Sequence, residues 1–97
     1  MPAYVIIYRE GPFKDESQYA EYRRVSAENR PDIRPKPLVV YGATEALEGQ
    51  APEGVVMLEF PTLDEAKAWY NSPGYQKAVK HRLASADWRA VLVEGVG

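Results

Sequence analysis

The chain has 97 residues, of which 45% are apolar and 27% charged, with a formal net charge of −2 and no cysteine. This length fits a single domain, residues 1–97, and the composition excludes a disordered chain. The charge argues against non-specific nucleic-acid binding, which needs clustered cations. The lack of cysteine excludes disulfides, thiolate metal sites and a cysteine nucleophile. No apolar run approaches the ~20 residues of a membrane-spanning helix and no signal-peptide pattern is visible, so the cytoplasm is the expected compartment.

Four segments are rich in β-branched and aromatic residues and are predicted to be strands. They are Tyr4–Tyr8, Leu38–Tyr41, Val55–Phe60 and Trp88–Glu94. The segment from Gly42 to Gly54 contains three glycines and Pro52, and we expect it to hold a turn and an irregular strand extension.

Helix-capping patterns mark the starts of the helical regions. Asp15 and Gln18 form a capping box that opens a helix across about residues 15–29, and Pro31 stops it. Thr62 and Glu65 open a second helix in the same way. That helix breaks at Asn71-Ser72-Pro73 and restarts with Ser72 as the N-cap, running to about Ala86.

The resulting βαββαβ order predicts an α+β, ferredoxin-like domain with an antiparallel four-stranded sheet and both helical regions on one face. The two central strands are apolar on both faces: Tyr4, Ile6 and Tyr8 alternate with Val5 and Ile7, and Val56, Leu58 and Phe60 alternate with Val55 and Met57. Helices can cover only one of these faces. We therefore expect a homodimer in which two sheets face each other. The alternative is a monomer with one curved sheet whose second face is partly solvated.

A long run of motifs resembles domain-of-unknown-function family 1330. The specific part is Glu59-Phe60-Pro61 followed by Ala68-Trp69-Tyr70-Asn71-Ser72-Pro73-Gly74-Tyr75, and the similarity extends over nearly the whole chain, including Met1–Ile6, Tyr19, Tyr22, Arg82 and Val91–Gly95. The resemblance implies a dimeric α/β barrel. It implies no reaction, because the wider superfamily includes cofactor-free oxygenases, haem-degrading enzymes, isomerases, ligand-sensing domains and stress proteins.

The loop before the second predicted strand departs from the family pattern, which has a glycine-rich turn there. Residues 30–37 read Arg-Pro-Asp-Ile-Arg-Pro-Lys-Pro, so three prolines stiffen this loop and three cations charge it. The role of the family's turn is therefore not carried over to this chain.

Arg82 is the first candidate for chemistry. With Tyr75, Val79 and Ala86 it forms one helical stripe, so it is expected to face the core. A buried arginine needs a partner. That partner is either a ligand carboxylate or enolate, bound by a bidentate contact, or an internal ion pair with Glu59, which interrupts the inward pattern of its strand.

Polar and aromatic side chains accompany Arg82. The first helix presents Tyr19, Tyr22 and Ser26 to one side, where they line a polar cavity or form a weakly amphipathic surface. Trp69 and Tyr75 are expected as aromatic walls, with ordinary core packing favoured for Trp69.

No cofactor or metal is expected. His81, the only histidine, is placed by the helical wheel away from the Arg82 stripe and is expected to be exposed. Neither glycine-rich phosphate-binding pattern occurs, and Ser72 is explained as a helix cap.

Two functional hypotheses remain open. In the first, a pocket binds a small organic acid or enol and supports cofactor-independent oxygenase- or isomerase-like chemistry, with Arg82, Glu59 and Tyr22 catalytic and Tyr19, Ser26, Trp69 and Tyr75 binding the ligand. In the second, the protein is a non-catalytic ligand-sensing or dimeric interaction module. A free guanidinium edge favours the first hypothesis, and a closed Arg82–Glu59 pair favours the second.

Overall fold

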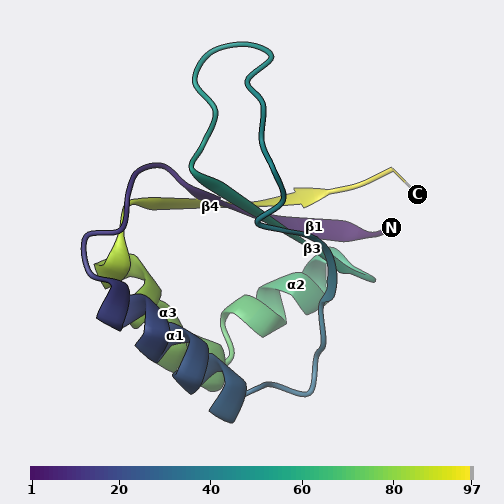
Figure 1. Cartoon of the computed structure of the whole chain (residues 1–97). Helices are drawn as coiled ribbons and strands as arrows, with labels where there is room; N and C mark the ends of the chain where they lie inside the picture. The colour runs from purple at the N-terminus through teal and green to yellow at the C-terminus, as the bar shows by residue number, and fades with distance from the viewer. Residues whose placement is uncertain (97) are drawn as a thin grey trace.

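Seven elements follow one another in the computed structural model, which describes residues 1–96. They are β1 (Ala3–Arg9), α1 (Glu16–Glu28), β2 (Lys36–Val40), β3 (Gly54–Phe60), α2 (Leu63–Tyr70), α3 (Pro73–Ser85) and β4 (Trp88–Glu94) (Figure 1). Because α2 and α3 together occupy the place of the second helix, the predicted βαββαβ order is confirmed.

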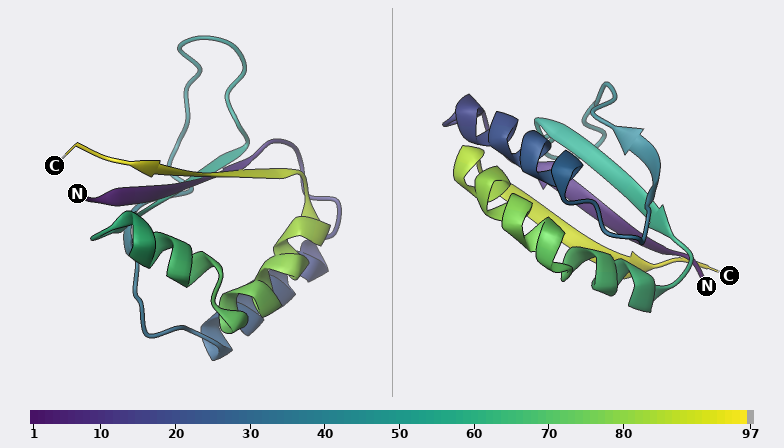
Figure 2. Two further views of the ribbon diagram at one scale, coloured as in Figure 1. Left: turned by 180° about the vertical axis from the view of Figure 1, so that it is seen from behind. Right: turned by 90° about the horizontal axis from the view of Figure 1, so that it is seen from below.

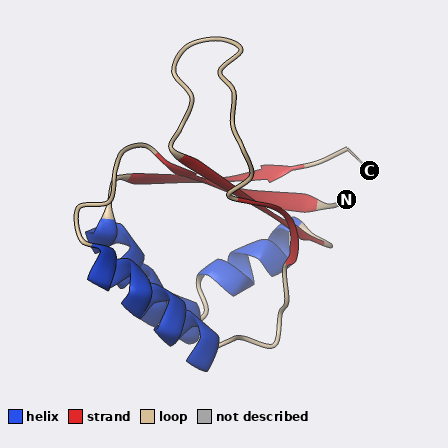
Figure 3. Cartoon of the chain, in the orientation of Figure 1, coloured by secondary structure: helices blue, strands red, loops and turns tan. Residues whose placement is uncertain are grey.

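The strands form one antiparallel sheet in the order β2-β3-β1-β4, with β1 and β3 in the centre (Figure 3). Across the sheet, Val5 of β1 pairs with Leu58 of β3 on one side and with Leu92 of β4 on the other. The sheet is the ferredoxin-like one that the order of elements predicts.

Each helix begins at the residue that its capping pattern indicates. The Asp15 carboxylate accepts hydrogen bonds from the backbone N–H groups of Ser17 and Gln18. The Thr62 hydroxyl accepts from the N–H of Glu65, and the Ser72 hydroxyl accepts from the N–H of Tyr75. These bonds satisfy N–H groups that have no partner within the helix, which explains why short polar residues stand at these three positions.

All three helices lie on one face of the sheet (Figures 1 and 2). α1 and α3 lie side by side, and both slope away from the sheet, whereas α2 lies closer to it. The core forms between these layers, where Val5 and Phe60 of the sheet meet Trp69 of α2 and Tyr75 of α3. Large aromatic side chains therefore bridge the distance between the sloping helix pair and the sheet.

The opposite face of the sheet, here called the outer face, carries no helix. Its centre is apolar, because Ile6 of β1 pairs with Met57 of β3 and with Val91 of β4. Val91 and Val93 remain 41% and 43% exposed. The prediction that the central strands are apolar on both faces, with helices on only one, is confirmed.

Residues 41–53 connect β2 to β3 without any strand, so the expected irregular strand extension is wrong. The loop projects from the sheet on the side away from the helices (Figure 1). At its base Tyr41 has a φ of 54°, an unusual value for a residue with a side chain. A Cβ on Gly54 would lie 3.0 Å from the Tyr41 ring, so glycine lets the ring pack against the start of β3.

Candidate functional site

Arg82 lies on the inward face of α3 and is only 2% exposed. Tyr75, Val79 and Ala86 are buried along the same stripe, as the helical spacing predicts. The sloping arrangement of α1 and α3 places the arginine between the helix pair and the end of the sheet where β4 begins. A charged side chain is therefore enclosed in the interior of a small domain.

The Arg82 guanidinium is surrounded by aromatic rings instead of carboxylates. Its central carbon lies 5.2 Å from the centre of the Trp88 ring and 5.8 Å from the centre of the Tyr22 ring. Nε and Nη1 are buried, and within residues 1–96 neither has a hydrogen-bond acceptor. Cation–π contacts contribute about 1 kcal/mol each, whereas an uncompensated buried charge costs several kcal/mol. The site therefore presents charged N–H donors that the protein itself leaves unsatisfied.

Phenolic hydroxyls gather around this guanidinium in two hydrogen-bonded pairs. The hydroxyls of Tyr22 and Tyr75 lie 3.0 Å apart, and those of Tyr19 and Tyr41 lie 2.5 Å apart. Burial raises the pKa of Tyr22, Tyr75 and Tyr41 above the ordinary phenol value, and the Arg82 charge opposes this rise in each of them. At neutral pH these groups are therefore protonated and can donate hydrogen bonds to an anion.

Aromatic stacking fixes the rings that carry these hydroxyls. Tyr19 stacks on Trp88 at 5.9 Å with an interplanar angle of 11°, and Tyr22 meets Tyr75 edge-on at 6.2 Å. Tyr75 in turn packs on Trp69 at 4.1 Å. The predicted aromatic walls are thus present, and Trp69 is buried in the core as expected.

Glu59 does not join this cluster. It pairs with Tyr4 across the β1–β3 ladder and is half-buried on the outer face, while its neighbours Leu58 and Phe60 point to the helices. No ion pair connects Glu59 to Arg82 in the part of the chain that the structure describes. The internal ion pair, one of the two alternatives for Arg82, is therefore not formed, because the sheet separates the two side chains.

Ser26, Trp69 and Tyr75 come together in a second part of the site, a pocket of about 350 Å³ beside the loop before β2. Arg30 and Arg34 also line this pocket. The sequence had indicated a charged, proline-stiffened loop here but gave no signal that its arginines lie at a pocket. Tyr41 was missed as well, since its position depends on a backbone conformation that no local motif predicts.

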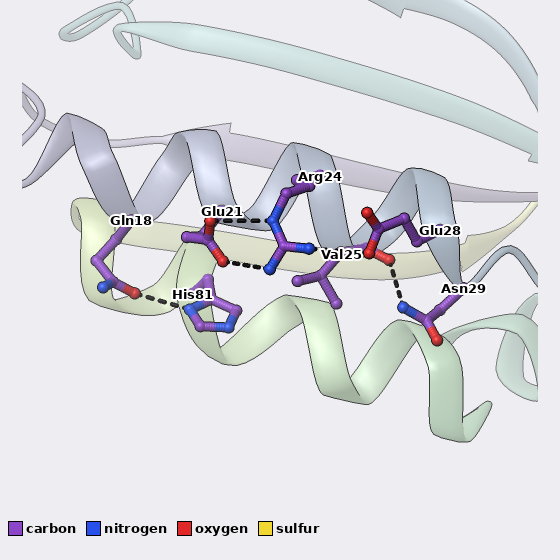
Figure 4. Close-up of polar contacts among 7 residues, drawn as sticks. All are labelled: Gln18, Glu21, Arg24, Val25, Glu28, Asn29 and His81. Carbon is purple, nitrogen blue, oxygen red and sulfur yellow. Dashed lines mark hydrogen bonds and ion pairs between the residues drawn. The ribbon is translucent and has the colours of Figure 1, made fainter.

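His81 lies at the contact between α1 and α3, away from Arg82 as predicted, but it is half-buried and not exposed. Its Nδ1 lies 2.8 Å from the side-chain oxygen of Gln18 (Figure 4). Gln18 therefore reaches α3 and does not close the capping box with Asp15. In the same view Arg24 forms ion pairs with Glu21 and Glu28 along α1. The charge of this arginine is therefore paired within its own helix.

No group of three or more metal-ligating side chains occurs among residues 1–96. Within the same range, no helix is long and apolar enough to cross a membrane.

Comparison with known proteins gives a family and a fold. The model of the family described as a domain of unknown function (DUF1330) matches residues 2–96. No curated protein matches the chain. Among solved structures, the chain is similar to a protein of unknown function from Rhodopseudomonas palustris, with 20% identity, a TM-score of 0.73, and coverage of 99% of this chain and 83% of that chain.

Two further solved structures extend the comparison. One is a dimeric ferredoxin-like protein of unknown function from Thermobifida fusca, with 14% identity, a TM-score of 0.59, and coverage of 97% of this chain and 90% of that chain. The other is SnoaB, a cofactor-independent oxygenase from Streptomyces nogalater, with 14% identity, a TM-score of 0.53, and coverage of 99% of this chain and 93% of that chain. At these identities the likeness establishes the ferredoxin-like fold.

Proposed function

The chain belongs to the DUF1330 family, and from this premise and the unpaired guanidinium of Arg82 we propose that the protein binds a small organic anion between its helices and its sheet. The single observation that carries the proposal is that Nε and Nη1 of Arg82 are buried without an acceptor. A carboxylate or enolate supplies two oxygen acceptors in the planar geometry that a guanidinium prefers. Binding therefore compensates a charge that the free protein leaves unpaired.

The neighbouring hydroxyls support the same assignment. Tyr22 and Tyr75 share one hydrogen bond, so their oxygens retain free lone pairs and one proton that can turn to a ligand. Tyr22 is half-buried and borders a surface hollow, so part of its ring is accessible from solvent. Tyr19 completes the ring of phenols through its stacking on Trp88.

Cofactor-independent chemistry on an enol is the catalytic form of this proposal. Arg82 would stabilise the negative charge of an enolate, and Tyr22, whose pKa is raised by burial, would act as a hydrogen-bond donor. Glu59 lies on the opposite face and takes no part at Arg82 within one subunit. SnoaB, a cofactor-independent oxygenase, has the same fold, and it supports this form by analogy only.

We further propose that the protein is a homodimer that buries the outer face against a second copy. Val91 and Val93 of β4 are exposed on the outer face, beside its apolar centre. The loop of residues 41–53 also borders a hollow of about 480 Å³ beside Tyr8 and Val55 on this face. A contiguous apolar surface of this kind is typical of an interface, and the relative from Thermobifida fusca is described as dimeric.

The test is a titration with simple carboxylates, such as benzoate and phenylacetate, followed by isothermal calorimetry and by the melting temperature. We compare the wild type with Arg82→Lys, which keeps the charge but loses the planar fork, and with Lys80→Met, which changes an exposed residue of the same helix. We expect Arg82→Lys to weaken binding at least tenfold and Lys80→Met to leave it unchanged. If no carboxylate binds the wild type, the anion site is refuted and the non-catalytic interaction module becomes the better description.

A further inference from the structure

The short loop between α1 and β2, residues 30–35, borders the pocket of about 350 Å³, here called the loop pocket. The loop returns from the end of α1 to the sheet (Figure 1). At its start Asn29 donates a side-chain hydrogen bond of 2.8 Å to the carbonyl oxygen of Val25, and in its middle Ile33 packs against the core. At its end Pro37 is paired in the β2–β3 ladder. A loop held at these three points keeps the pocket formed before any ligand binds, and the volume is within the range of about 300–1,000 Å³ typical of small-molecule sites.

Aromatic rings line the loop pocket on the side of the core. Trp69 of α2 and Tyr75 of α3 contribute to its wall, with their ring centroids 4.1 Å apart and the rings inclined by 36°. Both side chains are buried, so packing in the core fixes their orientation. Pro31 and Pro35 add rigid apolar surface from the loop. Walls of this kind favour a ligand with a flat aromatic body.

The charges at the loop pocket are all positive. Arg30 and Arg34 line it and are exposed, and no acidic side chain lines it. Asp32 lies between them in the sequence but does not line the pocket, and among residues 1–96 none of these three residues takes part in an ion pair. Two guanidinium groups without a carboxylate partner are suited to bind the carboxylate of a ligand.

The loop pocket and the Arg82 cluster are two separate places in the domain. Neither Arg82 nor Trp88 lines the loop pocket. The chain has two tryptophans, and each belongs to one of these places, because Trp69 lines the loop pocket whereas Trp88 contacts the Arg82 guanidinium. The indole N–H signals of the two tryptophans therefore report on the two places independently.

We propose that the loop pocket is a second anion site that takes a flat aromatic carboxylate, with the ring of the ligand against Trp69 and Tyr75 and its carboxylate bound by Arg30 and Arg34. This inference goes beyond the proposed function and does not depend on it, since the pocket needs no contribution from Arg82. It also assigns a role to the charged, proline-containing loop that departs from the family pattern.

The experiment is a titration of the ¹⁵N-labelled protein with 2-naphthoate, followed by the two indole N–H signals in NMR spectra. The variant Trp88→Phe identifies the signal of Trp69 by removing the other one. The dissociation constant taken from the Trp69 signal is then compared between the wild type and the double variant Arg30→Gln/Arg34→Gln. The matched control is Arg23→Gln/Lys36→Gln, which removes two exposed cations that flank the loop pocket without lining it.

We expect 2-naphthoate to shift the Trp69 signal of the wild type, and 2-naphthamide, which has the same rings without the charge, to bind at least tenfold more weakly. The double variant should bind 2-naphthoate at least tenfold more weakly at Trp69, whereas the matched control should stay within twofold of the wild type. The four substituted positions are exposed, so both double variants are expected to fold.

A Trp69 signal that does not respond in the wild type overturns the inference, and so does an equal loss of binding in the double variant and its control. A response of Trp88 alone supports an anion at Arg82 and refutes the loop pocket, whereas a response of Trp69 alone does the reverse. If both signals follow one dissociation constant and weaken together in the double variant, the two places form a single site and the inference of a second site is wrong.

Discussion

Replacing Arg82 by methionine should make the protein more stable while abolishing anion binding. Methionine keeps much of the apolar stem and volume of arginine but carries no charge. Breaking a buried ion pair ordinarily costs about 3–5 kcal/mol, because a charge is left uncompensated. Arg82 is already a buried charge without a hydrogen-bond acceptor at Nε and Nη1. Its removal therefore relieves a cost instead of creating one.

The magnitude follows from the contacts of the guanidinium. The cation–π contacts with Trp88 and Tyr22 stabilise the guanidinium by about 1 kcal/mol each. The buried charge costs roughly 3–5 kcal/mol, so the net cost of Arg82 to stability is about 1–3 kcal/mol. For a domain of this size we expect the melting temperature of Arg82→Met to rise by about 5–15 °C. Stability that increases as binding is lost is typical of a functional site.

The assay is urea unfolding at one fixed protomer concentration, in a buffer free of organic anions, because a bound anion would stabilise the wild type. Lys80→Met on the exposed side of α3 is the control and should stay within about 0.5 kcal/mol of the wild type. If Arg82→Met is less stable than the wild type by more than about 2 kcal/mol while the control is unchanged, Arg82 has a stabilising partner in the protein and the reasoning is refuted.

Three further outcomes are expected. Because burial raises the pKa of Tyr22 and Tyr75, the stability that they contribute is present below the unfolded-state pKa of about 10 and is lost as the pH rises above it. The loss is at most about 1.4 kcal/mol per pH unit for each group; urea unfolding between pH 8 and 11 measures it, and a flat profile would contradict it. Val93→Glu on the outer face should give monomers in light scattering. The control Leu83→Glu, which changes an exposed apolar residue of α3, should stay dimeric, and a dimeric Val93→Glu variant would argue against this interface. Gly74→Ala should cost about 2 kcal/mol, because the new methyl group would lie 2.2 Å from a carbonyl oxygen at the end of α1; an unchanged urea midpoint would show that the two helices do not need this close approach.

Local patterns were sufficient for the order and limits of most elements. Short polar residues such as Asp15, Thr62 and Ser72 satisfy N–H groups within the next turn, so their effect is confined to a few residues and can be predicted from them. The burial of Arg82 followed from helical periodicity in the same way. The apolar character of both faces of β1 and β3 was also visible, and with it the uncovered face of the sheet.

Contacts between distant segments were decided by the tertiary structure. Strand alternation places Glu59 opposite to Leu58 and Phe60, but with apolar residues on both faces nothing local determines which face meets the helices. The hydroxyl pair of Tyr19 and Tyr41 and the position of Arg30 and Arg34 beside Trp69 likewise join residues far apart in the chain. The sequence by itself therefore determined the elements, the fold and the buried arginine, because periodicity and capping act over one or two turns. Only the tertiary structure decided what surrounds that arginine, because side chains from α1, α3, β4 and the loops meet there through packing that no single segment encodes.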